Sequence, residues 1–187
     1  MSFALRITLA TLLAALVFVP WASVAEAGKA RTAQQCADAD LEASSSNLRR
    51  IRAAVVCLHN EIRARYHQAA LRENRRLHRA ALGHSRDMVT DDYFEHTTPE
   101  GTTTLDRILR SGYVGKGDGW VLGENLAWGT GAFGTPRSAI ETWMSSPAHR
   151  ANLLKKAYRE IGVGVVLGIP GSDAAGATYT VDFGVRR

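Results

Sequence analysis

Three segments of the chain carry side chains that could do acid–base or metal chemistry. Glu124 is the only charged residue in the apolar stretch 120–128, where its neighbours read Gly123-Glu124-Asn125-Leu126. A buried carboxylate costs free energy unless another group pairs with it, binds it or uses it. His96 lies in the turn-rich segment 92–101, and His149 follows a Ser-Pro-Ala sequence. These residues lie too far apart along the chain for a local metal motif, so any site that unites them must be assembled by the fold.

Two imidazoles and one carboxylate form a common ligand set for divalent transition metals, and they favour Zn²⁺ over Ca²⁺, which prefers oxygen ligands. A zinc-bound water would be acidic enough for hydrolysis, with Glu124 as the general base. Alternatively, His96, Glu124 and His149 bond to one another around buried water and hold their loops together. The residues alone leave open a metal or ligand cavity, a structural network and a catalytic site.

The elements that must position these residues are predicted from apolar periodicity and from turn signals. Steps of three and four residues predict a helix from Asn47 to about Tyr66 and a second over residues 73–91. Thr135-Pro136 and Ser146-Pro147 each mark a helix start. A short helix is also expected over 104–111, and strands over 120–128, 161–167 and 178–183. Helices first, and then strands mixed with helices, predict an α+β fold.

The N-terminal residues have the features of an export signal. Arg6 precedes an apolar run of thirteen residues, 7–19, which Pro20 ends, and Ala25-Glu26-Ala27 resembles a cleavage site. The run is shorter than the roughly 20 residues that cross a bilayer as a helix. We therefore predict a signal peptide over 1–27, a polar arm over 28–46 and a single domain over 47–187, without a transmembrane segment after cleavage. An uncleaved anchor is the alternative.

Cys36 and Cys57 are the only cysteines of the chain. In an exported protein such a pair indicates a disulfide, which here would tie the polar arm to the first long helix. Two free thiols are the alternative.

The formal net charge of +5 is modest, and arginines that interleave with apolar positions over 49–79 indicate a solvated helix face. No motif supports nucleic-acid binding. Weak attraction to an anionic cell envelope is the expected consequence of this charge.

Beyond the glutamate segment, several motifs occur in the order of a known family. Leu58 to Arg63 reads Leu-His-Asn-Glu-Ile-Arg, residues 94–101 read Phe-x-His-x-x-Pro-x-Gly, and residues 143–152 read Trp-Met-Ser-Ser-Pro-Ala-His-Arg-Ala-Asn. Segments 160–164 and 181–184 complete the series. Together these motifs resemble the CAP superfamily of cysteine-rich secretory, antigen 5 and pathogenesis-related proteins, especially its short bacterial members.

The resemblance implies an α-β-α sandwich in which a small, mainly antiparallel sheet lies between helical layers. It also implies a central cavity of two His and two Glu, for which His96, Glu124 and His149 match three positions. The second acid is replaced by Ser146, and Glu141 could substitute only if the local geometry shifted.

Several polar and aromatic residues are expected to have structural roles. Asn60 and Arg63 should bond loop backbone, and the tryptophans should lie in the core rather than bind a cofactor. The complete set of expected structural residues is Asn60, Arg63, Asn125, Trp128, Trp143 and Asn152.

The resemblance implies a secreted protein that binds a small lipid-like or envelope-derived ligand, or an extracellular partner, with a zinc-capable cavity. A metal-dependent hydrolase of cell-wall or peptide substrates and a purely structural interaction domain are the alternatives. A serine-protease-like arrangement would need Thr130 as its nucleophile, and an internal Thr lacks the N-terminal amine that usually activates this residue. We therefore expect binding rather than catalysis.

Overall fold

The computed structural model describes residues 36–115 and 119–186, which belong to one compact unit. The predicted signal peptide, 1–27, and the first part of the predicted arm, 28–35, lie outside the described residues. None of the helices in the described ranges is long and apolar enough to cross a membrane.

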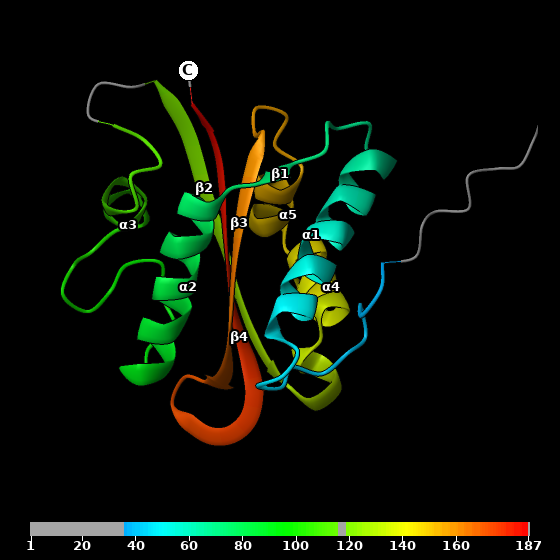
Figure 1. Ribbon diagram of the computed structural model, residues 1–187, viewed down its shortest axis with the longest axis vertical. Coiled ribbons are helices and arrows are strands. Elements are labelled where there is room, and N and C mark those ends of the chain that lie inside the picture. Colours follow the sequence, from blue (N-terminus) through cyan, green and yellow to red (C-terminus); the bar gives the residue numbers. More distant parts are fainter. Residues whose placement is uncertain (1–35, 116–118, 187) are drawn as a thin grey trace, which may run out of the picture. The chain divides into compact units, whose positions relative to one another are not determined.

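A four-stranded sheet lies between two helical layers, which confirms the predicted α+β sandwich (Figure 1). Helices α2 (Arg75–Thr90) and α3 (Thr104–Arg110) form one layer, and α1 (Leu48–Arg65), α4 (Pro136–Ser145) and α5 (Pro147–Leu153) form the other. The strands are β1 (Arg72–Glu73), β2 (Trp120–Thr130), β3 (Glu160–Ile169) and β4 (Ser172–Arg186), and a 3₁₀ turn, η1 (Gly131–Gly134), follows β2.

The sheet has the order β1-β3-β4-β2 and is mainly antiparallel. β4 pairs antiparallel with both β2 and β3, whereas the two-residue β1 pairs parallel with the start of β3. β4 begins at Ser172, although its sequence up to residue 177 is rich in Gly, Ala and Asp and was expected to be a connection. Ser172 pairs with Ile169 of β3, and Gly176 and Ala177 pair with β2, so backbone pairing at both ends overrides the weak strand propensity of this segment.

Glycines on one face of the sheet let α2 approach the strands closely. A Cβ on Gly162 would lie 2.1 Å from the backbone nitrogen of His78, and one on Gly164 would lie 2.4 Å from the backbone of Ala81. Real side chains do not fit at such separations, so α2 packs its own backbone against β3. The opposite face carries the larger hydrophobic core, in which Trp143 is fully buried.

The arm that precedes α1 is fastened by the predicted disulfide between Cys36 and Cys57. It is also held by Arg137 at the start of α4, whose backbone N–H donates to Ala39 and whose guanidinium pairs with Asp40 at 2.7 Å. The structure therefore confirms the disulfide and shows a second attachment, by which the arm reaches α4.

Candidate functional site

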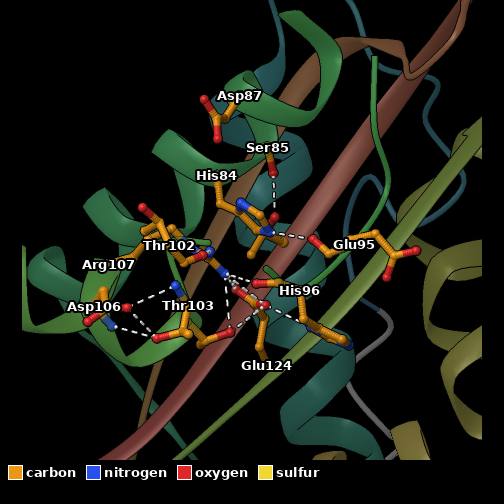
Figure 2. A network of polar contacts seen from close by, with 12 residues as sticks. His84, Ser85, Asp87, Glu95, His96, Thr102, Thr103, Asp106, Arg107 and Glu124 are labelled. Atoms are coloured by element: carbon orange, nitrogen blue, oxygen red, sulfur yellow. Dashed lines mark hydrogen bonds and ion pairs between the residues drawn. The ribbon is translucent and has the colours of Figure 1, made fainter. Parts of the chain in front are cut away.

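Glu124 lies on β2 with only 2% of its side chain exposed, and hydrogen-bond donors occupy both of its carboxylate oxygens (Figure 2). Nη2 of Arg107 donates to the two oxygens at 3.0 and 2.8 Å. The hydroxyl of Thr104 donates to Oε1 at 2.9 Å, and Nδ1 of His96 lies 2.8 Å from the same oxygen. The carboxylate is thus paired and fully hydrogen-bonded, as a buried charge must be.

The short helix α3 brings two of these donors to the carboxylate. Thr103 begins the helix with a capping box, in which its hydroxyl and Asp106 bond to each other's backbone N–H groups. Thr104 and Arg107 follow three residues apart and therefore share one face of the helix. Arg107 also donates to the carbonyls of Thr102 and His96, at 3.1 and 2.9 Å, so it fixes the loop that carries the histidine.

The environment keeps Glu124 ionised. Burial raises the pKa of its carboxyl, but the hydrogen bond from His96 and the charge of Arg107 outweigh burial and lower the pKa to about 2. In return, the hydrogen bond to Glu124 raises the pKa of His96, although partial burial opposes this. The ring of His96 stays accessible, since 52% of its side chain is exposed.

Asp182 is a second buried acid beside the site, and sequence reasoning missed it. It lies on β4 directly opposite Glu124 in the strand register and is fully buried. Neither of its carboxyl oxygens has a hydrogen-bond partner among the described residues. Burial, and then the negative charge of Glu124, raise the pKa of Asp182 well above its ordinary value, so Asp182 keeps its proton to a higher pH than Glu124 does.

The signal that singled out Glu124 also applies to Asp182, because it is the only acid in the predicted strand 178–183. Arg107 and Thr104 were missed as well. They form part of the predicted helix 104–111, but no local pattern indicates that this helix turns them toward β2.

His149 lies on α5 and does not bond directly to the other two predicted residues. Its backbone carbonyl accepts from Asn125 at 3.0 Å, and Asn152 donates to the carbonyl of Glu124 at 3.0 Å. Nδ1 of His149 is buried and has no partner among the described residues. Burial, and then the charge of His96, lower the pKa of His149, so the two histidines have pKa values shifted in opposite directions.

In the described part of the chain, no group of three or more His, Cys, Asp and Glu side chains is arranged to hold a metal ion. The guanidinium of Arg107 occupies both oxygens of Glu124, and its positive charge opposes a cation there. Glu124 instead takes the position of a carboxylate that orients a histidine through its second ring nitrogen.

Other residues considered for the site lie elsewhere. Thr130 is six residues from Glu124 along β2, about 20 Å in an extended strand, so it cannot complete a catalytic triad there. Ser146 precedes α5 at the cap position, but its side chain makes no capping bond. Glu141 is exposed on α4, where it lines a cavity with residues of α1.

Four of the six residues expected to be structural join α1 to the segment before β1 and to α5, and join α5 to β2. Asn60 bonds the carbonyl and the N–H of Leu71 at 3.0 and 2.7 Å, and Arg63 donates to the carbonyls of Ala69 and Leu153. The amides of Asn125 and Asn152 bond to each other at 3.2 Å.

The two tryptophans that were expected to lie in the core differ in burial. Trp143 is fully buried and donates to the carbonyl of Leu126 at 2.7 Å. The prediction that Trp128 lies in the core is wrong, because 48% of it is exposed. Trp128 shares the strand face of Glu124 but lies four residues, about 13 Å, further along β2.

Comparison with known proteins places most of this chain in one family. The family model of the cysteine-rich secretory protein family, CAP, matches residues 56–183. The uncharacterized membrane protein YlbC of Bacillus subtilis is 34% identical over 111 residues, which are 59% of this chain and 30% of that protein. The uncharacterized protein YkwD of the same organism is 33% identical over 112 residues, 60% of this chain and 41% of the relative. The chain thus spans less than half the length of these curated relatives.

Two solved structures share the fold. An extracellular protein containing an SCP domain from Bacillus anthracis is 29% identical with a TM-score of 0.60, and the match covers 78% of this chain and 44% of that one. An outer surface protein from Borrelia burgdorferi has a TM-score of 0.62 at 19% identity, over 78% of this chain and 96% of that one. The second likeness concerns the fold alone.

Proposed function

Since this chain belongs to the cysteine-rich secretory protein family, we propose that it is an exported binding protein whose recognition surface includes His96 and His149. Export is supported by the apolar run 7–19 and the small-residue sequence that ends at Ala27. The names of two structural relatives, an extracellular protein and an outer surface protein, agree with a location outside the cytoplasm.

The observation that carries the proposal is the complete engagement of Glu124. A general base needs a pKa near the working pH and a lone pair that can reach the proton it removes. Glu124 has a pKa of about 2, and Arg107, Thr104 and His96 occupy its oxygens. Such a carboxylate is a fixed acceptor that orients His96, which favours binding over hydrolysis.

The two histidines give this surface its chemistry. His96 has a raised pKa and a half-exposed ring, so it presents a positively charged donor as the pH falls toward and below 6.5. His149 has a lowered pKa, so it takes up a proton only at a lower pH than His96 does. A charged imidazole beside a neutral one suits an anionic oxygen, such as the phosphate or carboxylate of a lipid-like or envelope-derived ligand.

Zinc binding is a second proposal, limited to the two imidazoles. It is favoured by the hydrogen bond that turns Nδ1 of His96 toward Glu124 and leaves Nε2 for another partner. Two protein ligands make a weaker site than the three of usual zinc enzymes, so this proposal includes no hydrolytic step.

Co-sedimentation with vesicles of phosphatidylglycerol and phosphatidylcholine tests the first proposal. The exported chain should bind more strongly at pH 6 than at pH 8, and His96→Ala with His149→Ala should lose this binding. His67→Asn is the matched control, because His67 is exposed after α1 and Asn tolerates its backbone φ of 55°. Equal binding by all three proteins would contradict the proposed surface.

Two further measurements separate the alternatives. Hydrolysis of casein or cell-wall fragments by the wild-type protein, lost in Glu124→Gln, would replace the binding proposal with the hydrolase. Calorimetric titration of the metal-stripped protein with Zn²⁺ tests the second proposal, and heat that is unchanged in the double histidine variant would refute it.

A further inference from the structure

The outer edge of β3 is unpaired over most of its length. The two-residue β1 covers only its beginning, where Arg72 lies opposite Glu160 and Glu73 opposite Ile161. Beyond Ile161, no strand in the described part of the chain pairs with this side of β3. A row of free backbone N–H and C=O groups of this kind can accept a further strand.

The direction of the backbone groups follows from the hydrogen bonds at the start of the strand. Asn74 donates to the carbonyl of Ile161, and Nδ1 of His78 lies 2.6 Å from the carbonyl of Val163. Odd-numbered residues of β3 therefore direct their backbone groups outward, and Val165 and Leu167 come next. Among the residues that the structure describes, no hydrogen bond reaches the outward groups of these two.

At the opposite edge of the sheet, which β2 forms, outward carbonyls do have hydrogen-bond partners. The outward carbonyls of Leu122, Glu124 and Leu126 on β2 accept hydrogen bonds from the side chains of Tyr158, Asn152 and Trp143. Side chains of the same domain thus satisfy these three carbonyls at the edge of β2, whereas among the described residues the edge of β3 is open past Val163.

A cavity of about 510 Å³ lies along this open edge, between α1 and α2, which flank β3 in Figure 1. Val165 and Leu167 contribute its strand side, and Leu167 is 41% exposed. Leu48 of α1 and Leu82 of α2 add apolar surface from the two helices. The cavity, which we call the β3 groove, thus combines free backbone groups with an apolar lining.

The charged side chains that line the β3 groove are all positive. Arg49 and Arg52 of α1 and Arg86 of α2 line it, and no acidic residue does. Within the described ranges, Arg49 and Arg86 have no ion-pair partner, and Arg52 lies 3.4 Å from Glu73. The β3 groove therefore offers two uncompensated guanidinium groups, one on each helix.

We propose that the β3 groove binds an extended acidic segment of a partner protein, which adds to the sheet as a fifth strand beside Val165 and Leu167. Backbone hydrogen bonds would supply affinity, and the arginines would select acidic side chains on both faces of the added strand. Charge argues against two other occupants. A second copy would bring the same arginines, and residues 28–35 of this chain carry Lys29 and Arg31 but no acid.

One end of the β3 groove is closed, which limits the length of the added strand. Nη1 of Arg52 lies 3.2 Å from Nε2 of His78, and the other nitrogen of this ring bonds Val163. This bridge joins α1 to α2 across the strand edge. The bound segment should therefore be short, about five or six residues, which is also an ordinary strand length.

Fluorescence anisotropy with a labelled, end-blocked peptide, Glu-Glu-Val-Val-Glu-Glu, tests the proposal. In an extended peptide this sequence places one Val between two Glu on each face. The wild-type protein should bind it, and replacement of every Glu by Lys should abolish binding. N-methylation of both valines should weaken binding by about tenfold or more, because adjacent residues point their amides to opposite edges and one of the two must face β3.

Protein variants complete the test. Arg49→Glu with Arg86→Glu should weaken binding by about tenfold or more, whereas Arg75→Glu with Arg79→Glu, on α2 outside the β3 groove, should not. Leu167→Pro removes the outward N–H without removing a bond to β4 and should also abolish binding, provided that its thermal unfolding resembles that of the wild type.

Absence of peptide binding, or binding that is insensitive to N-methylation and to Leu167→Pro, would overturn strand addition. Dimerisation of the unliganded protein that Leu167→Pro removes would assign the β3 groove to a second copy and would also overturn the proposal. The His96→Ala with His149→Ala variant should bind the peptide normally, because those residues do not line the β3 groove.

Discussion

Replacement of Arg107 by Met removes the guanidinium that neutralises Glu124 while retaining a flexible apolar side chain in its place. Arg107 is only 8% exposed, and its terminal nitrogens also donate to the carbonyls of Thr102 and His96 in the site loop. The substitution therefore leaves a buried carboxylate without its cation and two loop carbonyls without their donor. We expect it to be among the most destabilising single changes in this layer of the domain.

The expected magnitude follows from two independent arguments. Removing one partner of a buried ion pair typically costs about 3–5 kcal/mol. Against the effect of burial, the pKa of Glu124 falls from 4.5 to about 2 on folding, first through the hydrogen bond from His96 and then through the charge of Arg107. The whole shift corresponds to about 3 kcal/mol at neutral pH, which is an upper limit for the share of Arg107 in it. Because the folded pKa is the lower one, this contribution is present above pH 4.5 and is lost as the pH falls through about 2.

Urea unfolding at pH 7 of Arg107→Met, Glu124→Gln and the double variant gives a double-mutant cycle. We expect the double variant to lose about 2 kcal/mol less than the sum of the single losses, since neither charge remains to be stranded. Arg110→Met is the matched control, because Arg110 is exposed on the same helix and should change stability by less than about 0.5 kcal/mol. Losses in the single variants that simply add, or an Arg107→Met cost below about 1 kcal/mol, would show that Arg107 does not stabilise the buried charge of Glu124.

Three further predictions concern other parts of the domain. Trp143→Ala should cost about 3–5 kcal/mol in urea unfolding and Trp128→Ala at least about 1 kcal/mol less, because Trp143 is fully buried whereas Trp128 is 48% exposed, and equal costs would contradict this. Reduction of the Cys36–Cys57 disulfide, which spans 21 residues, should lower the unfolding free energy by about 3 kcal/mol, and unchanged stability in dithiothreitol would argue against it. Asp182→Asn should gain stability relative to the wild type as the pH rises above 3.8. Above this pH the unfolded wild type releases the proton of Asp182 more readily than the folded protein does, so the wild type loses stability, whereas Asn does not titrate. A difference that does not change between pH 4 and pH 8 would contradict that assignment.

Local patterns predicted the helices closely, because each carries its own periodicity and its own start signal. The helix predicted from Asn47 is observed from Leu48, and Thr135-Pro136 begins α4 as expected. The strand predicted over 178–183 was too short, since residues 172–177 have weak strand propensity and the segment is held by pairing of Ser172 with β3 and of Gly176 and Ala177 with β2. Local sequence carries little information about such pairing.

The site was predictable only in part for a similar reason. Glu124 was conspicuous because a charge interrupts an apolar strand, and its contact with His96 followed from the family resemblance. The partner that decides its chemistry, Arg107, lies in an ordinary amphipathic helix and becomes relevant only when α3 docks on β2. Trp128 was misplaced because its type favours burial, whereas its position on the strand decides exposure.

The strand order has a consequence for how the protein is made. β4 is the last of the four strands in the chain, yet it lies inside the sheet and is the strand that joins β2 to β3. During synthesis, β2 and most of β3 therefore have no strand partner until residues 172–186 have left the ribosome. Asp182 arrives in the same segment, so the carboxyl pair is completed in the same step as the sheet. The sheet cannot be completed before residues 172–186 are available, so the domain folds late, which would suit the export as an extended polypeptide that we propose.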